Sequence, residues 1–264
     1  MDSGRFWRHY QHGKIFVIAP DKPSGDDFNL ALHQRGMQTE IFYYSVAPRV
    51  IGDQINPDPQ VERDLAGAIQ KGFDAGYHFM VIACNTLQLW LPKAIVLLPE
   101  KVQEDVRIFT TFTALKQKFP NHQNRPVWLG TTVICREMPE NNFQTLLSMN
   151  LPELQNNVQE IIWRVKGVTG ADIRTASGII KEIQNPKILK ETVSLFLRKV
   201  RDRSLKQAIM GCTELPIAFR EFCTEEEKSS LTLIDPAEVL ADILPSRIPE
   251  SRQILQKIIA NEGD

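Results

Sequence analysis

Short apolar runs alternate with longer amphipathic segments along most of this chain, and this alternation constrains the fold more than any other feature. Short runs without a polar face are typical of strands that are buried on both sides, and the segments between them have helical periodicity. We therefore predict an α/β fold with mostly parallel sheets flanked by helices. The predicted strands are Lys14–Ala19, Thr39–Tyr44, His78–Ala83, Arg107–Thr110, Pro126–Gly130, Gln207–Gly211 and Leu231–Ile234.

The predicted helices lie between these strands. Gln60–Gly72 follows a proline-rich stop, and Ala237–Leu244 follows Asp235-Pro236, a combination that begins helices. The pattern leaves Met149–Asn157 open between helix and loop, and the polar stretch Lys116–Pro126 is the best candidate for a linker. The remaining predicted helices are Asn142–Ser148, Val158–Val165, Ala171–Ile183 and Ile188–Arg201.

Charge and hydropathy exclude several classes of protein. The 264 residues contain 31 Lys and Arg against 32 Asp and Glu, so no global basic field attracts nucleic acid. Uninterrupted apolar runs such as Ala94–Leu98 are far shorter than the roughly 20 residues of a membrane helix. The N-terminal residues also lack the apolar core of a secretory signal. We therefore expect a cytoplasmic protein that binds neither nucleic acid nor membranes.

The four cysteines form no CxxC pair, and the five histidines are scattered without the spacing of metal ligands. This pattern does not resemble a disulfide scaffold or a zinc site, so we expect free thiols and no metal. Cys135 and Cys223 have no context that indicates chemistry, and we predict a structural role for both.

Cys84 and Cys212, in contrast, lie in matching contexts. Each follows a strand of the buried type and one small residue, and each precedes short polar residues that can cap a helix. We expect the small residues, Ala83 and Gly211, to let the backbone and a substrate come close. Ligands bind at the carboxyl ends of strands in open α/β sheets, and a helix N-terminus favours a thiolate and binds a carboxylate. A thiolate acts as a base or a nucleophile. A single buried cysteine is more often a small hydrophobe, but a matched pair favours the catalytic interpretation.

The two cysteine segments carry a resemblance to a known family. Ala83–Thr86 and Gly211–Pro216 resemble the two signature segments of the aspartate/glutamate racemase superfamily, and the second is particularly similar to the aspartate racemase branch. Three weaker likenesses occur in the same order as in that family, at Tyr43–Arg49, Trp128–Thr131 and Asp235–Glu238.

The resemblance implies two pseudosymmetric α/β domains with the active site in the cleft between them. The first would comprise residues 1–117 and 223–264 and carry Cys84, and the second would comprise residues 118–222 and carry Cys212. It also implies racemisation of an acidic amino acid without pyridoxal phosphate or any other cofactor. The two thiols would act as proton acceptor and donor on opposite faces of the substrate Cα. A homodimer is compatible with this interpretation of the sequence.

By the same resemblance, Asn85, Thr86 and Thr213 would hold the substrate α-carboxylate, and Thr131 would line the cleft. Glu214 matches an acidic residue of the family. Two roles stay open for it: orienting the substrate ammonium group, or capping its own helix.

The basic residues that contact a side-chain carboxylate in aspartate racemases are matched here by Arg49 and Lys166, although both also fit solvated surface charges. The family usually has a Gly-Gly-rich turn after the first strand, where this chain has Pro20–Asp27. Ser24 and Gly25 are the candidates for the role of that turn. Two alternatives therefore stay open: another cofactor-free isomerase or decarboxylase, and a protein that binds a small carboxylate without turning it over.

Overall fold

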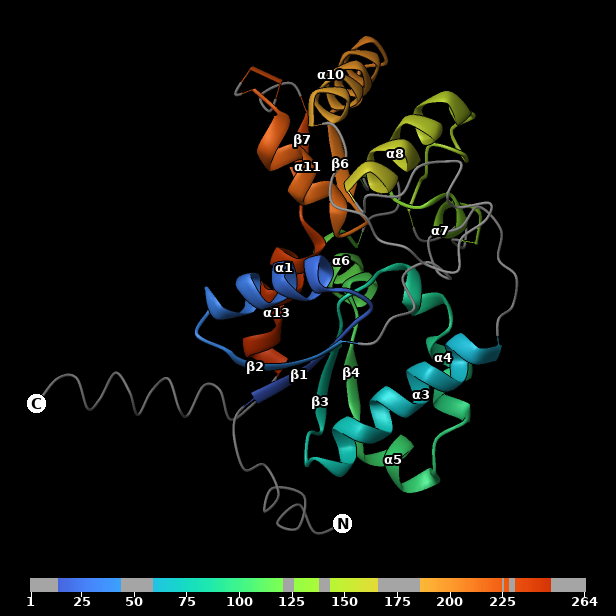
Figure 1. Cartoon of the computed structure of the whole chain (residues 1–264), viewed down its shortest axis with the longest axis vertical. Helices are drawn as coiled ribbons and strands as arrows, with labels where there is room; N and C mark the ends of the chain where they lie inside the picture. Colours follow the sequence, from blue (N-terminus) through green and yellow to red (C-terminus); the bar gives the residue numbers. More distant parts are fainter. Residues whose placement is uncertain are drawn as a thin grey trace, which may run out of the picture.

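The computed structural model describes residues 14–43, 59–120, 126–137, 143–165, 186–224, 226–227 and 231–247. It contains two parallel sheets, each flanked by helices, as Figure 1 shows. The predicted α/β fold is confirmed, and the ends of all seven predicted strands differ from the observed ends by at most one residue. No helix within these ranges combines the length and the apolar character that a membrane span needs.

The first sheet has the strand order β2-β1-β3-β4, and the second has the order β5-β6-β7. All neighbouring strands are parallel, so their carboxyl ends lie at one edge of each sheet. β3 and β6, which precede Cys84 and Cys212, are each flanked by strands on both sides. The strands are β1 (Lys14–Ala19), β2 (Gln38–Tyr43), β3 (Phe79–Ile82), β4 (Arg107–Phe109), β5 (Val127–Leu129), β6 (Gln207–Met210) and β7 (Thr232–Ile234).

Alternate residues of β1 point to two different helical layers. Ile15 and Val17 are buried against α1 (Lys22–His33), α6 (Thr111–Lys118) and α13 (Pro236–Arg247). Phe16 and Ile18 are buried on the other face, where α3 (Pro59–Asp74), α4 (Leu91–Val96) and α5 (Glu100–Asp105) lie. Burial on both faces explains why β1 is almost continuously apolar.

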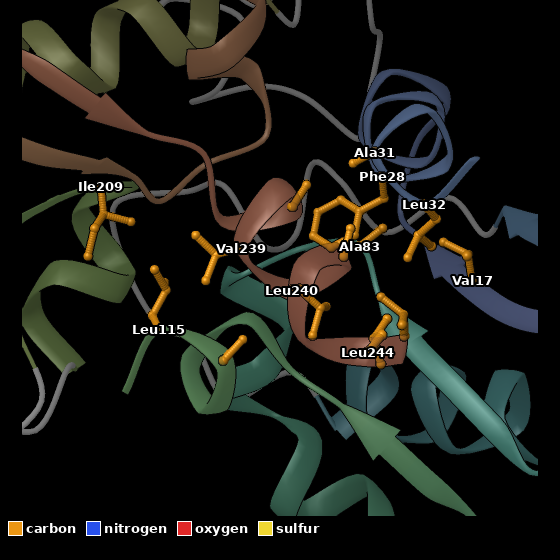
Figure 2. Close-up of a cluster of buried hydrophobic side chains, with 14 of the residues drawn as sticks. Val17, Phe28, Ala31, Leu32, Ala83, Leu115, Ile209, Val239, Leu240 and Leu244 are labelled. Carbon is orange, nitrogen blue, oxygen red and sulfur yellow. The ribbon is translucent and has the colours of Figure 1, made fainter. Parts of the chain in front are cut away.

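The second sheet shares its core with the first. Val127 and Met210 pack against α8 (Pro152–Val165), α10 (Pro186–Asp202) and α11 (Glu214–Phe222). On the opposite face, Trp128 and Ile209 belong to the same cluster as Leu115 and Val239 of the first sheet's helices, part of which Figure 2 shows. One continuous apolar core therefore joins the two halves.

Several helices differ from the sequence-based expectation. No helix was predicted after β1, where Pro20–Asp27 was compared with a turn, but α1 begins at Lys22, and Asp21 caps it by accepting a hydrogen bond from the Ser24 N–H at 2.9 Å. α8 begins at Pro152 and so includes most of the segment that the pattern left open. The predicted linker overlaps the last turn of α6, which ends at Lys118. The predicted helix Ala171–Ile183 lies outside the described residues.

The predicted helix Asn142–Ser148 is wrong over its described part. Thr145 forms an isolated bridge with Trp128, and the Trp128 N–H donates to the Gln144 carbonyl at 2.7 Å. The Thr145 and Ser148 side chains exchange hydrogen bonds with each other's backbone, and Asn150 has a positive φ of 57°. Local side-chain bonds of this kind compete with a helix and favour a turn.

The expected division into two domains stays a prediction. α13 packs against α1 and α6 of the first sheet, whereas β7 pairs with β6 in the second sheet. This pairing favours a return of the chain to the first half after residue 234, rather than after the expected residue 222.

Candidate functional site

Cys84 and Cys212 each follow the carboxyl end of an inner strand. Ala83 and Cys84 come directly after β3, and Gly211 and Cys212 come directly after β6. Both sulfur-bearing side chains are buried, at 8% and 6% exposed. Both cysteines therefore lie at the edge of the sheet where ligands bind in parallel α/β folds.

The Cys212 thiol has a carboxylate partner. Its Sγ donates to Oε2 of Glu214 at 2.7 Å, and the other oxygen of Glu214 accepts from the Thr213 hydroxyl at 3.4 Å. Glu214 is the first residue of α11 and is only 1% exposed. Sequence reasoning considered an ammonium partner and a helix cap for Glu214 and missed this contact with the thiol. A carboxylate at this distance can accept the proton of Cys212.

Ser24 joins this group from the opposite half of the molecule. It is fully buried in the first turn of α1, and its hydroxyl is 2.7 Å from the Thr213 hydroxyl. Ser24, Thr213, Glu214 and Cys212 thus form one hydrogen-bonded chain. Ser24 was a candidate for the role of the family's Gly-Gly turn, and the structure places it beside the second cysteine segment.

A second hydrogen bond crosses between the halves beside Cys84. The Thr86 hydroxyl lies 3.1 Å from the Thr131 hydroxyl, and both side chains are buried. Thr131 follows β5 and caps α7 (Thr132–Glu137), because its hydroxyl accepts from the Ile134 N–H at 3.4 Å. The structure therefore brings together two residues that lie 45 positions apart and that the sequence analysis predicted separately.

Asn85 is held by polar neighbours. Its Oδ1 accepts from the Thr111 hydroxyl and from Nε2 of Gln88. Gln88 Nε2 also donates to the Thr111 hydroxyl at 2.9 Å. Both of these hydrogen bonds to Asn85 use Oδ1, and the Nδ2 group is the donor that this side chain has for a carboxylate. Sequence reasoning missed Thr111, because it lies 26 residues from Asn85 and only the fold brings the two together. It also missed Gln88, for which the spacing of three residues from Asn85 was the available signal.

Trp128 explains the small residue before Cys212. A Cβ on Gly211 would lie 2.1 Å from Cε2 of the Trp128 ring, and a Cβ on Gly130 would lie 2.5 Å from its Nε1. The expectation that Gly211 admits the substrate is therefore corrected, because the indole ring occupies that space. Trp128 is fully buried and stacks on Phe112 with 4.7 Å between ring centroids. Its Nε1 has no hydrogen-bond partner among the described residues.

The two remaining cysteines differ from the pair. Burial raises the pKa of the Cys135 thiol to about 12, which keeps it protonated and unreactive. Cys223 is half-buried at the end of α11. These surroundings fit the structural roles expected for both. Of the other predicted site residues, Arg49 and Lys166 lie outside the described residues.

A group of charges surrounds the far end of α11. Arg220 forms an ion pair with Asp27 of α1, and its Nη2 lies 3.4 Å from a carboxyl oxygen of Asp235. Burial raises the pKa of Asp235 to about 7, with a smaller contribution from nearby Asp27. Burial also raises the pKa of Asp27, and the Arg220 guanidinium partly offsets that rise.

The arrangement supplies two thiols, one carboxylate and several neutral hydrogen-bond donors. A thiol next to a carboxylate can cycle between thiol and thiolate, which general acid–base catalysis requires. Amide and hydroxyl groups can bind a carboxylate without ionising themselves. Among the described residues, no group of three His, Cys, Asp or Glu side chains has the geometry of a metal site.

Comparisons with known proteins identify the fold. No protein-family model and no curated protein sequence matches the chain. The structure is similar to that of an aspartate racemase from Picrophilus torridus, with a TM-score of 0.59 and 15% identity over 89% of this chain and 94% of that one. It is also similar to that of an aspartate racemase homologue from Pyrococcus horikoshii OT3, with a TM-score of 0.54 and 19% identity over 89% of this chain and 98% of that one.

A glutamate racemase from Francisella tularensis, solved with D-glutamate, gives a TM-score of 0.56 and 15% identity over 90% of this chain and 82% of that one. At these identities the likeness shows the fold alone. The fold implied by the resemblance of the two cysteine segments is therefore confirmed: this chain has the α/β fold of aspartate and glutamate racemases.

Proposed function

We propose that this chain racemises an acidic amino acid, with aspartate as the first candidate and glutamate as the second, by a two-base mechanism without a cofactor. One observation carries the proposal. Cys84 and Cys212 each follow the inner strand of a different sheet, and the residues beside them meet across the two halves in the pairs Thr86–Thr131 and Ser24–Thr213.

Racemisation needs two proton-transfer groups because a proton leaves one face of Cα and another arrives on the opposite face. In one direction, the Cys212 thiol passes its proton to Glu214, and the resulting thiolate removes the Cα proton. Cys84 then donates its thiol proton to the other face. After product release, the protonation states of the two thiols are interchanged, and exchange of protons with solvent restores the starting state.

The substrate α-carboxylate carries part of the charge that develops when Cα loses its proton. The Nδ2 group of Asn85 and the hydroxyls of Thr86, Thr131 and Thr213 are the proposed donors to it. Hydrogen bonds from fixed donors to a developing negative charge stabilise the transition state more than the ground state. Arg49 and Lys166 are the proposed partners of the side-chain carboxylate, since guanidinium and ammonium groups pair with carboxylates.

The direct test is to incubate the purified protein separately with both enantiomers of aspartate, glutamate and alanine, and to follow each by chiral chromatography. We expect the two enantiomers of aspartate or glutamate to converge to an equal mixture, and alanine to be a poor substrate. The Cys135→Ser variant is the matched control and should behave like the wild-type protein.

Two results would contradict the proposal. Saturable binding of an acidic amino acid without interconversion would favour the non-catalytic carboxylate-binding alternative. Loss of the carboxyl group as CO₂ from a test carboxylate would favour a decarboxylase with the same fold.

A further inference from the structure

The helices α1 and α11 contact each other at two points. On α1, Ser24 and Asp27 are one turn apart and lie on one face of the helix. Thr213 is the N-cap residue of α11, and Arg220 follows it by two turns on the same face. The Ser24 hydroxyl meets the Thr213 hydroxyl at 2.7 Å, and the Arg220 guanidinium pairs with Asp27. These contacts fix both the position and the direction of the segment that carries Cys212.

The ion pair is asymmetric in its burial. The Arg220 side chain is 53% exposed, whereas that of Asp27 is only 7% exposed. One oxygen of Asp27 accepts from Arg220, and the other is buried without a hydrogen-bond partner among the described residues. Removing the guanidinium would leave a buried carboxyl group uncompensated, which costs far more than loss of an exposed ion pair.

The same guanidinium also reaches a second element of the first half. Its Nη2 lies 3.4 Å from Oδ2 of Asp235, and the other oxygen of Asp235 accepts from the Ala237 N–H at 2.9 Å, at the start of α13. Arg220 Nε donates to the Pro216 carbonyl at 3.2 Å within α11. One side chain therefore connects α11 to α1 and to the beginning of α13.

We propose that Arg220, through Asp27 and Asp235, is a positioning residue that holds α11, and with it the Cys212–Glu214 segment at its start, against α1. It contacts neither thiol and acts through the orientation of α11. The inference rests on the proposed function for its catalytic consequence, but the positioning itself can be measured without any turnover.

Arg35 provides a matched control within the same helical layer. It joins α1 to α13 through Glu238 and Asp242, and it makes no hydrogen bond or ion pair with α11. The Arg35→Gln variant therefore removes a comparable link between helices of the first half, while the link to the Cys212 segment stays intact.

The test is alkylation of the native protein by iodoacetamide at fixed pH, with the peptides that contain Cys84 and Cys212 quantified by mass spectrometry. We expect Arg220→Gln to raise the ratio of the Cys212 alkylation rate to the Cys84 alkylation rate about tenfold. This factor corresponds to a decrease of about 1.4 kcal/mol in the free energy of the local opening that exposes Cys212. Arg220→Lys keeps the charge and should restore most of the protection. Arg35→Gln should leave the ratio unchanged.

Asp27→Asn is the second variant and should raise the same ratio, because it removes the partner of Arg220 while preserving the shape of the side chain. In the racemase assay, Arg220→Gln should lower kcat and leave KM within about twofold, the pattern for a lost transition-state interaction. An unchanged Cys212-to-Cys84 ratio in both Arg220→Gln and Asp27→Asn overturns the proposal, as does an equal rise for both cysteines. A wild-type protein without racemase activity would contradict the proposed function, and the alkylation ratios would still decide the positioning role.

Discussion

The segments that follow Cys84 and Cys212 are alike in sequence and different in structure. After Cys84 comes a 3₁₀ turn of four residues, Thr86–Leu89, whereas Cys212 is followed by the nine-residue helix α11. The side chains after Cys84 are neutral, and Asn85 bonds to Thr111. The Cys212 thiol instead contacts the carboxylate of Glu214.

Under the proposed mechanism, this difference predicts that the two thiols play unequal parts in proton transfer. A carboxylate beside Cys212 can take its proton within the protein. The neutral amide and hydroxyl groups near Cys84 suit binding of a carboxylate better than proton transfer. If the proposed function is right, two segments that look duplicated divide the work of one site.

The largest expected effect tests whether both thiols are needed at all. Cys84→Ser and Cys212→Ser should each lower kcat/KM for racemisation by a factor of about 10²–10⁴, since each removes one of two catalytic bases. Chiral chromatography measures the rate, and circular dichroism verifies the fold. Cys135→Ser and Cys223→Ser are the controls and should change little. Near-normal activity of either variant of the pair would remove the basis of the two-base mechanism.

A smaller effect tests the unequal roles of the two segments. Glu214→Gln keeps the shape of the side chain but cannot accept the Cys212 proton, so it should lower kcat/KM by about 10². The loss in kcat/KM must be equal for the L-to-D and the D-to-L reaction, because the two enantiomers are equally stable and the equilibrium constant is therefore one. Gln88→Ala, a comparable change near Cys84, should cost less than Glu214→Gln. The opposite order would show that the Cys84 side depends more strongly on its polar neighbours.

The small residues before the two cysteines, Ala83 and Gly211, differ in the space around them, and this difference can be tested through the stability of the protein. Ala83 already has the Cβ that Gly211 lacks, and a Cβ on Gly211 would overlap the Trp128 ring. Gly211→Ala should lower the free energy of unfolding by about 1–3 kcal/mol, the typical cost of overpacking. Urea denaturation measures it. Gly67→Ala, in α3 where a Cβ meets nothing within 4 Å, should stabilise the protein by about 0.5–1 kcal/mol.

The last expected effect depends on pH and concerns the charges beside α11. The raised pKa of Asp235, about 7, means that the folded protein holds this proton up to a higher pH than the unfolded chain does. The contribution of Asp235 to stability is therefore lost as the pH rises from about 4 to about 7.

Asp235 faces Asp27 of α1, Arg220 of α11 and Glu238 of α13, and Asp235→Asn removes its charge while keeping an oxygen for the Ala237 N–H. The variant should gain stability relative to the wild-type protein across that pH range and show a constant difference above it. Thermal unfolding at pH 4 to 8 measures the difference, and a difference independent of pH would contradict the assignment.

The sequence was sufficient for the strands and for the matched cysteines, because burial on both faces and a small residue before a cysteine are local signals. It also contained the start signal of α1, an Asp followed by Pro two residues later, although no helix was predicted there. The role of Gly211 was misjudged because the Trp128 ring that fills its space lies 83 positions away.

The contacts that organise the site could not be predicted from the sequence. Ser24 and Thr213 are 189 residues apart, and Asp27 and Arg220 are 193 apart, so no local pattern connects them. The contact of Glu214 with Cys212 depends on the rotamer of a side chain at the start of a helix, which the residue spacing does not determine. Topology and packing decide such contacts.

The measurement that tests the central claim most directly is racemisation in D₂O, with deuterium at Cα followed by mass spectrometry in the product and in the recovered substrate. A thiol carries a single proton, so the thiol that donates to the product face brings deuterium from the solvent. We predict that, at early times and from either enantiomer of the acidic amino acid, the product is deuterated at Cα and the remaining substrate is not. Deuterium entering the remaining substrate as fast as product forms, or product that retains the original hydrogen, would contradict the two-base account.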